Sequence, residues 1–180
     1  MSEQSRSGNF EQVVLPHLDA AYNVARWLTR NEHDAEDVVQ EAYMRAFRFF
    51  GSFRGGSARA WLLRIVRNTS YTLLEKNRPQ QFAREFDEKL FGPDPRASSP
   101  EEIVLRSDSG RLLRQALEKL PKGFREVLIM REFQGMSYKK ISQVTGTPLG
   151  TVMSRLWRAR SGLRQSLTDL ENADTLSTSW

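Results

Sequence analysis

The sequence contains no cysteine and only two histidines, His17 and His33, among its 180 residues. Without cysteine the chain has no disulfide, no thiolate metal site and no thiol redox chemistry of its own. It also shows no glycine-rich phosphate loop and no cluster of inward-facing carboxylates. We therefore expect neither an enzyme nor a site for a metal or a cofactor.

Long apolar runs are also missing. The longest, such as residues 127–130, are far shorter than the about 20 residues that span a bilayer. Residues 1–8 lack the apolar core of a secretory signal. These absences predict a cytoplasmic chain that does not insert into a membrane.

Acidic residues are absent from two long stretches, although the whole chain holds 22 of them against 27 basic residues. The charged residues in the stretch 42–74 are all basic: Arg45, Arg48, Arg54, Arg59, Arg64 and Arg67. The charged residues in the stretch 133–168 are also all basic: Lys139, Lys140, Arg155, Arg158, Arg160 and Arg164. One such stretch fits a solvated surface equally well. Two of them, separated by an acidic middle, favour nucleic acid as the partner.

Apolar residues recur with helical spacing, and no stretch alternates as a strand does. The predicted fold is all-α, with two small helical domains joined by a flexible linker. The first domain covers residues 9–76, with one helix around residues 14–28, a second over 34–50 and a third over 58–76. The linker covers residues 77–98 and includes Phe82, Phe86 and Leu90 at the spacing of a short helix. The second domain covers residues 99–171 and opens with a capping box at Ser99, and residues 172–180 are expected to form a disordered tail.

The second domain is predicted to end in a helix-turn-helix. Ser137 caps a short helix over residues 138–144, residues 145–147 form the turn, and Pro148 begins the last helix. The predicted inward residues of that helix are Leu149, Val152, Leu156, Ala159 and Leu163. Its outer face includes Thr151, Ser154, Trp157 and Arg158. The alternative is a capped helical hairpin with a soluble face.

The residue types on this outer face suit duplex DNA. Arg158 and Ser154 are the predicted groove contacts, and Arg155, Arg160 and Arg164 suit phosphates. Lys139 and Lys140, on the preceding helix, would also reach the DNA backbone. The role of Trp157 stays open between a wedge against DNA and a shield for the edge of the core.

The second and third helices of the first domain carry two further candidate faces. Acids mixed with exposed apolar residues favour a protein partner on the second helix, although an ordinary solvated face is the alternative. That face comprises Asp34, Asp37, Gln40, Glu41, Met44, Phe47 and Arg48. The third helix is predicted to point Trp61, Leu62, Ile65, Thr69 and Leu73 inward. Its outward residues, Arg64, Arg67, Asn68, Tyr71 and Leu74, follow a loop with Phe53 and Arg54, and basic residues interleaved with rings suit unpaired DNA. Phe53 and Trp61 could equally be core residues.

Four motifs carry a resemblance to a known family. Residues 34–47 and 53–68 resemble region 2 of the bacterial sigma-70 superfamily, specifically the small extracytoplasmic-function (ECF) sigma factors. Residues 120–121, 125–127, 135–141 and 150–160 resemble region 4 of the same proteins. The resemblance spans about residues 10–167. It implies a promoter-specificity factor for RNA polymerase.

The resemblance also implies roles for residues. Asp34, Asp37, Gln40 and Glu41, with Met44 beside them, would contact core RNA polymerase. Asn68 and the loop before it would help to capture an unpaired base of the −10 element, and Ser154, Arg155 and Arg158 would act on the −35 duplex. It further implies a cognate anti-sigma factor, whereas the chain offers no sign of a homo-oligomer. Met153 departs from the Lys or Arg that family members often carry, which suggests an altered −35 preference; Arg59, Ala60 and Gly56 also depart.

Three other functions fit the sequence less well. A sigma mimic that only sequesters an anti-sigma factor should have lost its basic reading faces, which this chain retains. A repressor that uses the helix-turn-helix alone leaves residues 34–47 without a purpose. An enzyme has no catalytic constellation to work with.

Overall fold

The computed structural model describes residues 3–77 and 108–177, and within these ranges the chain is helical with no strand. The predicted all-α class is therefore confirmed. By its contacts the chain divides into two compact units. The first comprises residues 1–78 with 129–152, and the second comprises residues 79–128 with 153–180. The predicted linker helix and the capping box at Ser99 lie outside the described residues.

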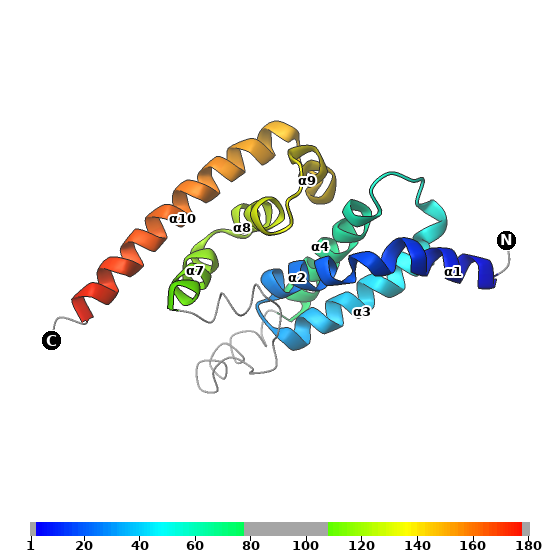
Figure 1. The fold of residues 1–180 in the computed structure, drawn as a ribbon, viewed down its shortest axis with the longest axis horizontal. Coiled ribbons are helices and arrows are strands. Elements are labelled where there is room, and N and C mark those ends of the chain that lie inside the picture. The colour runs from blue at the N-terminus through cyan, green and yellow to red at the C-terminus, as the bar shows by residue number, and fades with distance from the viewer. Residues whose placement is uncertain (1–2, 78–107, 178–180) are drawn as a thin grey trace. The chain divides into compact units, whose positions relative to one another are not determined.

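The first unit is built on three helices that all contact one another, α2 (Leu18–Thr29), α3 (Glu32–Phe49) and α4 (Ala58–Lys76) (Figure 1). They are preceded by α1 (Glu3–Val14) and a short 3-10 helix, η1 (Leu15–His17). The prediction of one continuous first helix is wrong, because Pro16 interrupts it. Proline lacks the N–H that a helix interior requires, and it is tolerated only in the first turn of a new segment.

α1 docks through one aromatic residue. The ring of Phe10 is 3% exposed and meets the rings of Tyr43, Phe47 and Phe50 edge-on, with centroids 5.3, 5.2 and 5.4 Å away. Edge-to-face pairs of this kind stabilise by about 0.5–1.5 kcal/mol beyond the area they bury. Phe10 therefore joins α1 to the C-terminal half of α3. Burial raises the pKa of the Tyr43 hydroxyl in this cluster, and nearby Glu11 raises it further.

α4 buries a wider arc than its sequence predicts. Leu62 and Thr69 lie inside as expected, but Leu74, predicted to point outward, is also buried. Trp61, Ile65 and Leu73 are only partly buried, whereas Leu63, Val66 and Ser70 are fully inside. The reason is that α4 contacts both α2 and α3, so its apolar surface covers two neighbours and not one.

Residues 129–152 belong to the first unit through contacts with α2 and α4. They contain a π-helical turn, η3 (Ile129–Phe133), and α9 (Tyr138–Thr145). Nη2 of Arg59 donates hydrogen bonds to the backbone oxygen and to Oε1 of Gln134, at 2.7 and 2.8 Å. The ring of Phe133 lies 5.2 Å from that of Trp27. Arg59, which departs from the family pattern, thus holds a backbone carbonyl.

The second unit contains α7 (Asp108–Lys119), α8 (Lys122–Leu128) and most of α10 (Leu149–Ser177). α7 ends two residues before Pro121, which cannot continue a helix. Leu117 and Leu120 on α7 and its end, and Leu156 and Ala159 on α10, are buried. A Cβ placed on Gly162 would lie only 3.0 Å from Cδ2 of Leu120, so the absence of a side chain there permits a close approach.

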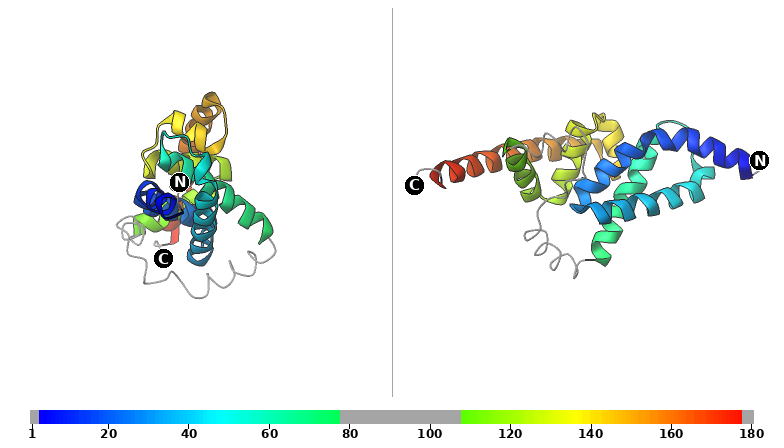
Figure 2. Two further views of the ribbon diagram at one scale, coloured as in Figure 1. Left: turned by 90° about the vertical axis from the view of Figure 1, so that its right-hand side faces the viewer. Right: turned by 60° about the horizontal axis from the view of Figure 1, so that its bottom comes forward.

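α10 is longer than predicted. It continues to Ser177 as one unbroken helix (Figure 2, orange to red), through most of the tail expected to be disordered from residue 172 onward. Residues 163–177 contain no glycine or proline. Nε2 of Gln165 donates to Oδ1 of Asp169, four residues later, at 2.9 Å. Such i, i+4 contacts support an exposed helix.

Candidate nucleic-acid interface and partner face

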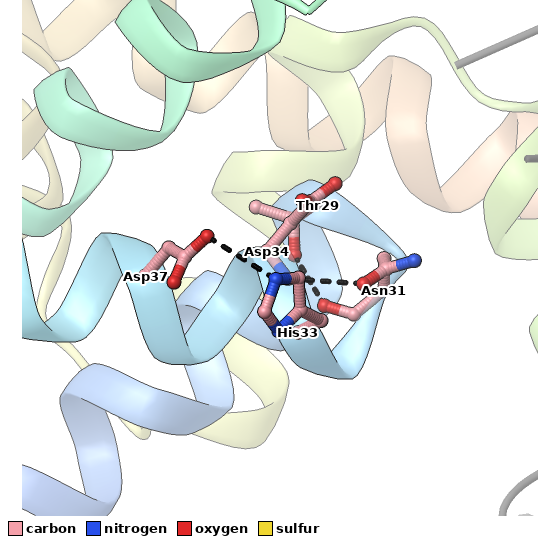
Figure 3. Close-up of polar contacts among 5 residues, drawn as sticks. All are labelled: Thr29, Asn31, His33, Asp34 and Asp37. Carbon is pink, nitrogen blue, oxygen red and sulfur yellow. Dashed lines mark hydrogen bonds and ion pairs between the residues drawn. The ribbon is translucent and has the colours of Figure 1, made fainter. Parts of the chain in front are cut away.

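The start of α3 is fixed by a cap (Figure 3). Oδ1 of Asn31 accepts a hydrogen bond from the backbone N–H of Asp34 at 2.9 Å. The hydroxyl of Thr29 donates to the backbone oxygens of Ala25 and Asn31, at 2.8 and 3.1 Å. An Asn cap satisfies an N–H that would otherwise lack a partner at the helix end. The helix therefore begins two residues before the predicted Asp34, at Glu32.

Asp34 does not lie on the exposed side of α3. Only 3% of it is exposed, although the sequence placed its carboxylate beside Asp37 as a contact for the polymerase. A carboxylate in the first turn of a helix favours the positive end of the helix dipole. Its burial indicates that Asp34 supports the start of α3 and is not available for a direct contact.

The other four predicted residues do share an exposed surface, which we name the α3 face: Asp37, Gln40, Glu41 and Met44. All four are exposed, and Met44 is 62% exposed. Oε1 of Glu41 pairs with Nε of Arg45 at 2.7 Å, and Oδ2 of Asp37 lies 3.7 Å from Nε2 of His33. The face thus presents carboxylates around one large apolar side chain.

The loop before α4 turns at two glycines. Gly55 and Gly56 have φ of 90° and 84°, a region that other residues rarely adopt. Phe53 is partly buried, with its ring stacked on that of Phe50 at 6.1 Å and tilted against that of Trp61 at 5.2 Å. The loop holds two predicted DNA contacts. Arg54 is exposed, whereas Phe53 packs against an aromatic cluster with Phe50 and Trp61.

Three predicted residues meet on the outer side of α4, and we name them the α4 cluster: Arg67, Asn68 and Tyr71. Nη1 of Arg67 donates to Oδ1 of Asn68 at 3.2 Å, and its guanidinium lies 4.7 Å from the centre of the Tyr71 ring. A cation held over a ring in this way is attracted by the ring's negative face. Arg64, one turn earlier, is exposed. The arrangement joins a positive charge, an amide and an aromatic plane.

The boundaries of the helix-turn-helix agree with the prediction to within one residue, since α9 ends at Thr145 and α10 begins at Leu149. Oγ of Ser137 accepts from the backbone N–H of Lys140 at 3.2 Å, and this caps α9. The turn follows at Gly146, with φ of 67°, and the hydroxyls of Thr145 and Thr147 lie 2.8 Å apart across it. The N–H of Val152 then donates to the carbonyl of Pro148 at 3.0 Å, which starts α10.

The outer side of α10 presents what we name the α10 face: Met153, Ser154, Trp157 and Arg158. All four are exposed, while Val152, Leu156 and Ala159 on the opposite side are buried. The prediction that Leu149 points inward is wrong, since it is 48% exposed. Of the two roles predicted for Trp157, the shield for the edge of the core is wrong, because the side chain is 71% exposed.

The remaining predicted DNA contacts are less uniform. Lys139 and Lys140 are exposed on α9, and Thr151 is partly buried. The guanidinium of Arg155 lies against Gly123, where a Cβ would sit 3.6 Å from its Cζ, and Arg155 is partly buried. Met153 is part of the α10 face, although the sequence marks it only as a departure from a family pattern. Its spacing of four residues from Trp157 is the signal that could have placed it on the exposed face.

The described residues contain no group of three or more His, Cys, Asp or Glu side chains arranged to hold a metal ion. Among those same residues, no helix has the length and apolar character needed to cross a membrane.

An all-α chain with an exposed, basic helix-turn-helix defines a class of DNA-binding proteins. Comparison with known proteins gives the family. The Sigma-70 region 2 family matches residues 13–80 and the Sigma-70 region 4 family matches residues 110–163. The chain belongs to the sigma-70 family, as an ECF RNA polymerase sigma factor.

Individual relatives agree with this assignment. The ECF RNA polymerase sigma factor SigE of Mycolicibacterium smegmatis is 33% identical over 168 residues, which cover 92% of this chain but only 64% of SigE. The RNA polymerase sigma-H factor of Pseudomonas aeruginosa is 34% identical, over 89% of this chain and 87% of its own length. Among solved structures, the sigma factor RpoE from Bartonella quintana, in complex with the anti-sigma factor NepR, is 30% identical with a TM-score of 0.68. That similarity covers 89% of this chain and 97% of RpoE.

Proposed function

We propose that this chain binds core RNA polymerase, docks on the −35 duplex of its promoters and captures separated bases of the −10 element. The observation that carries the proposal is the pair of basic surfaces in the two acid-free stretches, one exposed on α10 and one partly exposed on α4. The α4 cluster lies in residues 42–74, and the α10 face lies in residues 133–168. The α4 cluster offers an aromatic plane and a charge, which suit an unpaired base, whereas the α10 face offers side chains along a helix, which suit a duplex groove.

The α3 face is the proposed contact with core polymerase. Its apolar centre, Met44, is surrounded by Asp37, Gln40 and Glu41, and exposed apolar groups of this size usually mark a binding surface. Phe47, three residues after Met44 and 41% exposed, extends the apolar surface along the same side of the helix. Asp34, being buried, is left out of the proposed face.

The α4 cluster, with Arg54 and Arg64, is the proposed site for the −10 strand. Arginine neutralises phosphates, an aromatic plane stacks on an unpaired base, and the Asn68 amide can both donate to and accept from a base edge. Phe53 would contact the strand only with the edge of its ring, because Phe50 and Trp61 pack against the rest of it. Trapping unpaired bases shifts the equilibrium toward open DNA, and this offsets the few kcal/mol that each flipped base costs.

The helix-turn-helix is the proposed −35 module. Arg158 and Ser154 would contact base edges, while Arg155, Lys139, Lys140 and Thr151 would position the helix on the phosphates. In this proposal the domains are residues 9–76 and 99–171, joined by residues 77–98. The chain initiates transcription in the cytoplasm without making or breaking bonds itself.

An anti-sigma factor is a further proposed partner. The Bartonella RpoE, 30% identical to this chain, was solved with the anti-sigma factor NepR. The α3 face is the surface we propose for such a partner here, because occupying it would also block the proposed polymerase contact.

Run-off transcription tests the proposal directly. Core polymerase with the purified chain is supplied with templates from the chain's own regulatory region, and we expect transcripts from a defined start site. Core polymerase alone, and core polymerase with a Met44→Asp variant, are the matched controls and should give none. The proposal fails if no template yields a promoter-specific transcript with the wild-type chain. A chain that binds an anti-sigma factor but supports no transcription would instead be a sigma mimic.

A further inference from the structure

The α10 face contains an apolar row beside a polar one. Met153 and Trp157 lie four residues apart and are 52% and 71% exposed. Ser154 and Arg158 repeat the same spacing one residue later and are also exposed. Residues four apart lie on the same side of a helix, so the two rows run in parallel along the second and third turns of α10.

Small residues lie at both ends of the two rows. Gly150 comes about one turn before Met153 and Ser161 about one turn after Arg158, and a Cβ added at Gly150 would meet nothing within 4 Å. These two positions add no bulk that would keep the rows from the floor of a groove.

The charges around the apolar row favour DNA over a protein as its occupant. No acid occurs between residues 133 and 168, and Lys139, Lys140, Arg160 and Arg164 are all exposed. An apolar patch in an acid-free stretch that carries exposed basic residues is complementary to a polyanion that also offers apolar groups. The major groove of duplex DNA is such a surface, because thymine places its 5-methyl group there.

We propose that Met153 and Trp157 read thymine methyl groups in the −35 element, beside the bases contacted by Ser154 and Arg158. This inference rests on the proposed function of the α10 face and adds the chemical basis of its selectivity. Arginine distinguishes guanine through O6 and N7, but a hydrogen-bonding row does not sense a methyl group. The apolar row therefore selects thymine over cytosine at positions that Arg158 does not reach.

The test removes the methyl group from the DNA. Holoenzyme formed with the full chain is bound to duplex −35 probes in which each thymine in turn is replaced by deoxyuridine. We expect one or two neighbouring positions at which the affinity falls about fourfold, the effect of one buried methyl group. At those positions the Met153→Ala and Trp157→Ala variants should bind the thymine and deoxyuridine probes equally.

A matched control lies on the same helix. Leu176 is 71% exposed, as Trp157 is, but lies about five turns further along α10. The Leu176→Ala variant should keep the full response to deoxyuridine. All three substituted positions are exposed, so none removes a residue of the core.

Two outcomes would overturn the inference. One is that holoenzyme binds the −35 duplex selectively but no deoxyuridine substitution changes its affinity. The other is that Met153→Ala and Trp157→Ala weaken binding to core polymerase and not to DNA, which would make the apolar row a protein contact. Failure of the proposed function would look different, since the unmodified duplex would then show no sequence-selective binding at all.

Discussion

The α4 cluster and the α10 face are both basic surfaces on exposed sides of helices, but they are organised differently. In the α4 cluster the side chains hold one another, since Arg67 contacts both the Asn68 amide and the Tyr71 ring. In the α10 face the helix itself sets where each side chain lies. Val152, Leu156 and Ala159 are buried on its opposite side and hold the helix in place. An unpaired base needs a plane and a charge set in place, whereas a duplex groove needs a rigid rod with side chains along one side.

The largest effect should come from Arg158→Ala. Loss of a guanidinium that contacts a base edge should weaken binding of the holoenzyme to the −35 duplex by about 10- to 100-fold. Binding to core polymerase should not change, because the α3 face is untouched. Fluorescence anisotropy with labelled −35 duplexes measures the first, and native gel assembly with core measures the second. Equal loss of both would contradict the assignment of this face.

Tyr71→Ala tests the organisation of the α4 cluster. Removing the ring takes away both a stacking plane and the surface that holds Arg67, so affinity for a single-stranded −10 oligonucleotide should fall about tenfold. Tyr71→Phe is the matched control, since it keeps the ring and should bind nearly as wild type. A similar loss in both variants would mean that the hydroxyl, and not the ring, is what the strand contacts.

Lys140→Gln separates phosphate contacts from base contacts. A lysine that pairs with one phosphate releases about one counterion, so the slope of log affinity against log salt should decrease by about one. The loss should be the same for specific and unrelated duplexes. If it is confined to the specific −35 sequence, Lys140 reads bases and the distinction between α9 and the α10 face is lost.

The smallest expected effect concerns pH. Burial lowers the pKa of His17 below its usual 6.5, and the positive charge of nearby Arg59 lowers it further. The unfolded chain then binds more protons than the folded one below about pH 6.5, so this group makes the fold less stable on acidification. In His17→Gln, urea midpoints should decline less between pH 7 and pH 5 than in the wild type. An identical decline in both would show that other groups carry the acid sensitivity.

The features that the sequence predicted best are those set by local chemistry. The bounds of α4, the Ser137 cap and the turn at Gly146 each depend on a residue type with a strong local preference. The exposure of Arg64 and Asn68 on α4, and of Ser154, Trp157 and Arg158 on α10, followed from helical spacing.

The errors came from packing and from helix length. A helix with one buried stripe would point Leu74 outward, but α4 packs on two helices and buries it. Leu149 was placed inward because its spacing fits the core stripe, but the first turn of α10 leaves it 48% exposed. The burial of Asp34 and the attachment of Gln134 to Arg59 depend on contacts between segments distant in sequence, which periodicity does not reveal.

The exposure of Trp157 makes it an intrinsic fluorescent probe of the α10 face. Trp27 and Trp61 are partly buried, and Trp157 is by far the most open tryptophan among the described residues. In a Trp180→Phe background, the part of the intrinsic emission that responds to a water-soluble quencher should come mainly from Trp157. Protection of that part by DNA would report occupancy of the α10 face in real time, without a label attached to either molecule.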